Sequence, residues 1–314
     1  ADGDDRPAST ARVYFGREQG WVECPRLSPR NLGEAETPGP VLVQIGQATA
    51  VIPKGGSVSL SSGGLLDICL PARETQRQGA PGWEGRAALE LFQNKLGTVV
   101  DRMAYTVART AYSTMASDSH DFSVAICDAA GRVVNQGLGV LIHLGSVTSA
   151  MEAIAASDLV PLEPGDVVLL NDPYNGGTHL PDLILVSPAF SGAVLIGHTV
   201  AIAHMIDVGG IAAGSFMTNA KELIQEGIVI PPVRLYERGE MNQAVESILR
   251  RNIRQPVETL GDLHSLVAAT RIGAQRLQAL AEELGTPRLA AAMQDLIDYA
   301  EERGRRELSA LGDS

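Results

Sequence analysis

A polar loop between two apolar runs carries the residues of this sequence that are best suited to do chemistry. The loop, NDPYNGGTHLPD, spans residues 171–182; VVLL precedes it and LILV follows it. Short apolar runs bounded by turn residues are typical of buried strands, so we expect this loop where strands end. Its side chains able to bind a metal or move a proton are Asp172, His179 and Asp182.

His179 and Asp182 stand three positions apart, a spacing at which one turn can aim an imidazole and a carboxylate at a single point. Both groups are ordinary ligands for zinc, manganese and iron. His204 ends a later predicted strand and Asp121 begins an earlier one, so all four can meet at one edge. Such a set suits Zn²⁺ or Mn²⁺ with a position open to water or substrate. The same spacing also fits a surface histidine beside a turn-capping aspartate, and spacing alone leaves both interpretations open.

Other polar residues have at least one simpler interpretation. His143 lies in an apolar run, where it is either a buried, hydrogen-bonded side chain or a general base near the site. Asp172 precedes a proline and is expected to form a turn. Asp207 precedes two glycines, so a turn role and a ligand role both remain open. Structural or solvated positions are expected for the remaining histidines, which are His120, His198 and His264.

Composition and charge limit the kinds of protein and of binding partner that fit this sequence. The chain has 314 residues, 45% of them hydrophobic, which is enough for a substantial core. A net charge of −12 argues against nucleic acid and anionic membranes as partners, because phosphates repel an acidic surface. No apolar run approaches the roughly 18 residues of a membrane span. The cysteines lack metal-site spacing, and we expect reduced thiols in a cytoplasmic protein.

The predicted elements indicate two domains. Short strands separated by turn signals run from Arg12 to Leu70 and predict a small β barrel or sandwich. We therefore assign residues 1–75 to a β domain, 76–85 to a linker rich in charge, Pro and Gly, and 86–314 to a second domain.

The second domain is predicted to mix helices with hairpins. Residues 86–115 predict a long helix because apolar side chains recur on one face, and Gly97 within it is expected at a close helix contact. Two hairpins follow, DFSVAICD with RVVNQ and LILVSPAF with AVLIGHTVAIAH, and a helix over 146–157 lies between them. Helices are predicted from Asn242 onward. Because hairpins dominate, we predict an α+β fold with a mainly antiparallel sheet and a helical C-terminal part.

Known nucleotide and hydrolase signatures are missing from the sequence. It contains no GxxxxGK[ST] loop, no convincing dinucleotide fingerprint and no GxSxG elbow. The sequence signals therefore indicate no nucleotide site on this chain.

The second predicted domain carries long motifs: HDFSVAICDAAGRVV, IHLGSV, GDVVLLNDPYNGGTHLPDLILVSPAF, AHMIDVGG and EGIVIPPVRLYERGE. From about Glu90 onward it closely resembles the hydantoinase B family, which includes the B half of 5-oxoprolinase and the large subunits of acetone and acetophenone carboxylases. The resemblance implies that the metal ligands are Asp121, His179, Asp182 and His204. It also implies that part of the B-type unit is missing from this chain.

The first predicted domain, with GPVLVQIGQATAVIPKGGSV, resembles the C-terminal β domain of the hydantoinase A family. It departs from that pattern at Gln44 and Gly46, which replace an acidic pair. The order of the two parts matches fused oxoprolinase-like proteins. The expected partners are therefore an A-type ATP-binding subunit and a chain that supplies the rest of the B-type unit.

The resemblance implies a subunit of an ATP-dependent, metal-containing hydrolase of cyclic amides, of the hydantoinase or 5-oxoprolinase type. A partner would phosphorylate the carbonyl of a lactam or hydantoin, and His143 would be a proton-transfer group. Two alternatives remain: an ATP-dependent ketone carboxylase subunit, and a non-catalytic scaffold subunit.

Overall fold

The computed structural model describes residues 9–310, apart from 17–18, 47, 72–84, 138 and 216. The chain forms two compact units, Ala1–Gly79 and Ala80–Ser314. The linker predicted at 76–85 lies, except for its last residue, outside the described residues. No described helix combines the length and the apolarity that crossing a bilayer requires.

The first unit is built from strands, as predicted. Its sheets have the orders β1-β2-β4-β5 and β3-β6-β7, and only the β2–β4 pair is parallel among the described strands. A small apolar core centred on Val43, Ile52 and Val58 is buried in this unit. The elements are β1 (Thr10–Tyr14), β2 (Trp21–Leu27), the 3-10 helix η1 (Pro29–Asn31), β3 (Thr37–Pro38), β4 (Val41–Ile45), β5 (Ala48–Ile52), β6 (Ser57–Leu60) and β7 (Leu66–Cys69).

The second unit contains a sheet of seven strands in the order β14-β13-β10-β11-β12-β8-β9, and every pairing is antiparallel. Both predicted hairpins are present, as β8–β9 and β11–β12. The α+β fold class is therefore confirmed. The strands are β8 (Phe122–Cys127), β9 (Val133–Gln136), β10 (Val167–Leu170), β11 (Asp182–Ser191), β12 (Val194–His204), β13 (Val233–Glu237) and β14 (Glu240–Met241).

Helices account for the rest of the regular structure in the second unit. They are α1 (Arg86–Thr110), α2 (Thr114–Ser117), α3 (His143–Ala155), the 3-10 helix η2 (Leu223–Gln225), α4 (Gln243–Asn252), α5 (Pro256–Leu284) and α6 (Thr286–Ala310). The helix predicted over 86–115 ends earlier, at Thr110. The reason is tertiary: the buried Asp262 carboxylate accepts hydrogen bonds from the backbone N–H groups of Tyr112 and Ser113, at 2.7 and 3.0 Å.

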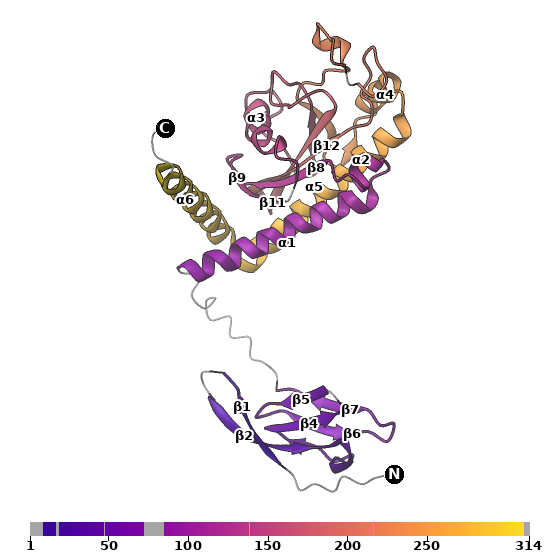
Figure 1. Cartoon of the computed structure of the whole chain (residues 1–314). Helices are drawn as coiled ribbons and strands as arrows, with labels where there is room; N and C mark the ends of the chain where they lie inside the picture. Colours follow the sequence, from indigo (N-terminus) through magenta and orange to yellow (C-terminus); the bar gives the residue numbers. More distant parts are fainter. Residues whose placement is uncertain are drawn as a thin grey trace. The chain divides into compact units, whose positions relative to one another are not determined.

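The sheet of the second unit lies between two helical layers. Figure 1 shows α1 and α5 side by side along one face of the sheet, while α3 covers the other. Alternate residues of each strand point to opposite faces. On β12, for example, Ala201 and Ala203 belong to the core under α1 and α5, whereas Val200 and Ile202 belong to the core under α3.

The expected close contact at Gly97 is wrong. A Cβ atom at Gly97 would meet no other atom within 4 Å. The close approach lies instead at Gly273 of α5, where a Cβ would come within 2.5 Å of Met103 Sδ and 2.8 Å of Thr199 Cγ2. Helical periodicity reveals which face of a helix is apolar, but it does not reveal which small residue faces a partner.

Candidate metal centre

Strand register brings two of the predicted metal ligands together. Asp182 is the first residue of β11 and pairs directly with His204, the last residue of β12. By strand alternation, the side chains of both residues lie on the sheet face that α3 covers, and so does the side chain of Ser123 on β8. The first residue of α3 is His143. One corner of the sheet thus collects a carboxylate, two imidazoles and a hydroxyl from four separate elements.

The predicted loop adds His179 to this corner. One ligand atom from each of His179, Asp182 and His204 lies within 4.8 Å of the others. Nδ1 of His179 is 2.8 Å from Asp182 Oδ2, and Nδ1 of His204 is 3.3 Å from Asp182 Oδ1. The two imidazole rings are 4.9 Å apart, centroid to centroid. The structure therefore places the side chains of His179, Asp182 and His204 in one cluster.

Asp182 is a fully buried carboxylate, with 0% of its surface exposed. Burial alone would raise its pKa, but the surrounding side chains of His143, His179, His204 and Thr178 together hold that pKa below its usual range. Oδ1 has no hydrogen bond, since the contact with His204 falls short of hydrogen-bond geometry. A buried, charged oxygen without a hydrogen bond is costly unless a cation compensates it.

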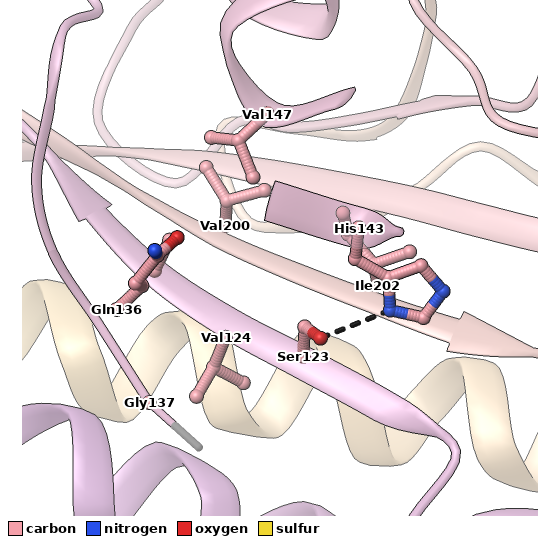
Figure 2. Close-up of a pocket in the computed structure, with 9 residues that line it drawn as sticks. Ser123, Val124, Gln136, Gly137, His143, Val147, Val200 and Ile202 are labelled. Carbon is pink, nitrogen blue, oxygen red and sulfur yellow. Dashed lines mark hydrogen bonds between the residues drawn. The ribbon is translucent and has the colours of Figure 1, made fainter. Parts of the chain in front are cut away.

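His143 is the other buried neighbour of Asp182. Its Nε2 lies 3.2 Å from Asp182 Oδ2, and its Nδ1 lies 2.9 Å from Ser123 Oγ (Figure 2). The hydroxyl of Ser123 accepts a hydrogen bond from the backbone N–H of Val140, so its own proton is free to go to Nδ1 of His143. An ionised carboxylate can only accept, so the contact with Asp182 Oδ2 requires a proton on Nε2 of His143.

A small cavity of about 10 Å³ lies beside His143, lined also by Ser123, Gln136, Val147 and Val200 (Figure 2). That volume is about the size of one water molecule. His143 itself has 1% of its surface exposed. A substrate of several heavy atoms therefore does not fit against His143 from this side.

Asp121 lies next to the cluster without belonging to it. Its backbone carbonyl accepts a hydrogen bond from the N–H of His204 at 3.1 Å. The pKa of His179 is raised, chiefly by its hydrogen bond to Asp182, with burial opposing and the charges of Asp182, Asp121 and Glu226 adding to the rise. Asp121 and Glu226 thus act on His179 electrostatically.

The other residues singled out in the sequence have structural positions. Asp172 forms a turn, accepting a hydrogen bond from the backbone N–H of Tyr174. Asp207 also has a turn role: it accepts from the N–H groups of Gly209 and Gly214 and pairs with Arg254. His198 is buried and bonded to the carbonyl of Asp128, whereas the exposed histidines are His120 and His264.

Several contributors escaped the sequence prediction. Thr178 donates to Asp182 Oδ2, and Ser123 orients His143, yet a hydroxyl beside a histidine has no distinctive spacing. The sequence identified Asn171 only as the first residue of the loop and indicated no role for its side chain. Glu226 lies forty-seven positions from His179 and no local pattern connects them.

Comparisons with known proteins identify the family and agree with this fold. The family profile described as "Hydantoinase B/oxoprolinase" matches residues 86–314. The beta subunit of caprolactamase from Pseudomonas jessenii is 31% identical over 225 residues, which is 72% of this chain and 39% of that subunit. The 5-oxoprolinase of Saccharomyces cerevisiae is 28% identical over 329 residues, covering 99% of this chain and 25% of the yeast protein.

Solved structures show the same relationship. The crystal structure of ATP-dependent caprolactamase from Pseudomonas jessenii matches 72% of this chain and 39% of that chain with a TM-score of 0.68 and 30% identity. A nucleotide-free acetone carboxylase structure matches 67% of this chain and 29% of that chain with a TM-score of 0.63 at 20% identity, which shows a shared fold. This chain therefore spans less than half the length of the relatives it matches. The match over residues 86–314 makes the chain a member of the hydantoinase B/oxoprolinase family.

Proposed function

We propose that this chain is a subunit of an ATP-dependent hydrolase of cyclic amides and that His179, Asp182 and His204 hold a divalent metal ion. The observation that carries the metal site is Asp182: a buried carboxylate, flanked by imidazoles, with one oxygen that has no hydrogen bond. The substrate class rests on relatives named caprolactamase and 5-oxoprolinase.

The donor set fits Zn²⁺ or Mn²⁺. Two imidazoles and one carboxylate are ligands that both ions accept, and they leave further positions open. We assign the fourth protein ligand to Asp121, whose backbone is bonded to His204 and whose carboxylate has no hydrogen bond among the described residues. The ion, when bound, would polarise a substrate carbonyl or activate water.

The chain's own residues prepare this site. Thr178 and His143 donate to Asp182 Oδ2 and so keep its carboxylate ionised and fixed in orientation. His143 was predicted as a proton-transfer group, and its position behind Asp182 also suits a positioning role. Because Nε2 of His143 faces a carboxylate that can only accept, it acts there as a donor rather than a base.

We further propose that partner chains complete the enzyme. The caprolactamase that resembles this chain is described as ATP-dependent, and this chain spans 39% of its beta subunit. We assign ATP binding to a hydantoinase A-like partner and the missing B-type portion to a second chain. The 5-oxoprolinase match covers 99% of this chain, against 72% for the caprolactamase subunit, which supports an A-type tail at residues 1–75 and a B-type domain at 86–314.

Metal analysis of the purified chain tests the site. We expect about one Zn²⁺ or Mn²⁺ per chain, and loss of that metal in His179→Ala, Asp182→Asn and His204→Ala. Asp172→Asn, in the same loop but serving a turn, is the matched control and should keep the metal. Full metal content in the three site variants would contradict the proposal.

The reaction class is tested with the chain assembled with its partner chains. The cyclic amide proposal expects ATP turnover that depends on a lactam or hydantoin and not on bicarbonate. ATP turnover with ketones that requires bicarbonate, with lactams inert, would instead establish the carboxylase alternative. Activity unchanged in His179→Ala would establish the scaffold alternative.

A further inference from the structure

A buried amide side chain follows the strand β10. Asn171 comes directly after Leu170, the last residue of β10, and has 0% of its surface exposed. Strand β10 lies between β11 and β13, so Asn171 lies where the segments that lead into these two strands come together. Its backbone N–H donates to the carbonyl of Ile230, on the segment that leads into β13, at 3.0 Å.

The side chain of Asn171 bonds both of these segments. Its N–H₂ group donates to the carbonyls of Leu180 at 2.8 Å and Ile228 at 3.0 Å. Its oxygen accepts from the N–H of Ile230 at 2.7 Å. Both N–H groups and the oxygen are thus used, as a buried amide requires. The carboxamide joins the two segments through their backbone atoms, as a peptide group does in a sheet.

The bond to Leu180 lies inside the turn that carries two of the proposed metal ligands. Leu180 stands between His179 and Asp182 in the chain, and it is fully buried. The N–H of Asp182 donates to the carbonyl of His179 at 3.0 Å, which closes the turn. Asn171 therefore fixes the backbone of the turn 179–182 at a point next to one ligand and two residues from the other.

The first part of the loop also folds closely over Asn171. A Cβ at Gly177 would lie 2.4 Å from the backbone oxygen of Asn171. Gly176 has a φ of 102°, and a Cβ there would lie 2.8 Å from Cα of Ala150 on α3. Both approaches require glycine, so the loop is packed against both Asn171 and α3.

We propose that Asn171 is a positioning residue of the metal centre. Its side chain holds the turn 179–182 against the segment 228–230 and so places His179 and Asp182 before the ion binds. Ligands that are already ordered lose less conformational entropy on binding, which favours a higher affinity. The inference rests on the proposed metal site and adds to it a residue that acts through the backbone of the turn.

Zinc affinity of the full chain, measured by competition with a chromogenic chelator at neutral pH, tests this role. We expect Asn171→Ala to lower zinc affinity about 10-fold or more, as is typical of residues that orient ligands. Asn171→Asp keeps the shape but places a carboxylate against two carbonyl oxygens, so it should lose affinity as well. Asn175→Ala, at an exposed position of the same loop, should keep the wild-type affinity.

A second control separates positioning from a general loss of stability. Asn242 caps α4 and also bonds the backbone of β13, so Asn242→Ala should destabilise the fold yet keep the zinc affinity. Co²⁺ bound in place of zinc reports the ligand geometry through its d–d absorption bands. We expect these bands to change in Asn171→Ala and to stay as in the wild type in Asn242→Ala. Wild-type bands in Asn171→Ala, or equal losses of zinc affinity in the two variants, would overturn the inference.

Amide exchange in the wild-type chain gives a test that needs no variant. Zinc should order the turn, and Asn171 should pass that order on to Ile230, whose N–H donates to its side chain. We therefore expect zinc to slow exchange at Ile230 more than at Val245, whose N–H donates to the side chain of Asn242. Equal slowing at the two amides would contradict the coupling.

The outcomes separate this inference from the proposal beneath it. If the wild-type chain binds neither Zn²⁺ nor Mn²⁺, the metal site and the inference fail together. If the wild type binds zinc and a folded Asn171→Ala binds it equally well, only the inference fails. If Asn171→Ala does not fold, Asn171→Asp and the exchange at Ile230 decide the role of Asn171.

Discussion

At the scale of single residues, the centre depends on how one carboxylate is kept charged while buried. Asp182 has no water-facing surface, and its stabilisation comes from side chains on three different parts of the chain. Removing one partner of such a group usually costs more than the bond itself was worth, because the remaining partner stays buried. The donors around Asp182 are therefore sensitive positions even where they touch no substrate.

His143→Ala separates two roles for this histidine. If His143 positions Asp182, the variant loses about 10-fold or more in zinc affinity, since orienting partners of ligands usually have effects of that size. Chelator competition measures this, with exposed His264→Ala as the control. Unchanged zinc affinity combined with a lower kcat in the assembled enzyme would instead establish the proton-transfer role.

At the scale of elements, α5 is packed so closely on the sheet that one glycine is required. Thr199 of β12 donates to the carbonyl of Thr270 at 2.8 Å, and one turn later Gly273 faces Thr199 and Met103. Thr199 is β-branched and hydrogen-bonded, so it cannot easily rotate away from an added methyl group.

We predict opposite effects for two glycine-to-alanine changes. Gly273→Ala should lower the free energy of unfolding by about 1 kcal/mol or more, because the added methyl overpacks the contact. Gly97→Ala, in open space on α1, should raise it by up to about 1 kcal/mol through helix propensity alone. Urea titrations of both variants measure these changes, and equal effects would contradict the packing argument.

The strand β12 also carries a pH-dependent contribution. Burial lowers the pKa of His198 from 6.5, although its bond to the Asp128 carbonyl opposes this. As the pH falls below about 6.5, the unfolded chain takes up a proton at this residue before the folded protein does. The contribution of His198 to stability is therefore present above that pH and is lost as the pH falls towards the folded-state pKa.

Replacing His198 removes this contribution. His198→Asn should show a smaller loss of unfolding free energy between pH 7 and pH 5 than the wild type. Urea unfolding in metal-free buffer at both pH values measures the difference, and His264→Ala serves as a control for an exposed histidine. Parallel losses in His198→Asn and wild type would contradict this reasoning.

At the scale of the whole molecule, the two units have separate apolar cores. The proposed metal ligands belong only to the second unit. A ligand that binds only the folded state stabilises that state by about 2.7 kcal/mol at one hundred times its Kd. Calorimetry should therefore resolve two transitions, of which Zn²⁺ raises one and a chelator lowers the same one. A shift of both transitions would contradict independent cores.

Local signals account for the parts of this molecule that sequence could predict. The hairpin β11–β12 and the apolar face of α1 follow from periodicity, and the grouping of His179 with Asp182 follows from a loop between two strands. The fold class follows from the number of hairpins. The placement of residues 1–75, 76–85 and 86–314 as domains remains a prediction.

The rest depends on contacts between distant segments, which local patterns do not encode. The early end of α1 is set by Asp262, more than a hundred residues away. The backbone at Ile228 is fixed by Asn171, and the importance of Gly273 is set by Met103. In each case the deciding residue lies on another element, so neither propensity nor spacing could identify it.

The turn of the β11–β12 hairpin is also a suitable place to attach a label. Register is regular from Asp182 and His204 to Ala189 and Gly197, and then shifts by one residue before the turn at Ser191–Val194. The turn lies at the opposite end of the hairpin from Asp182 and His204. A peptide tag or fluorophore attached at the turn would therefore be separated from the histidines by the regular part of the strand pair. The hairpin is thus a natural place to attach a reporter that leaves the metal corner untouched.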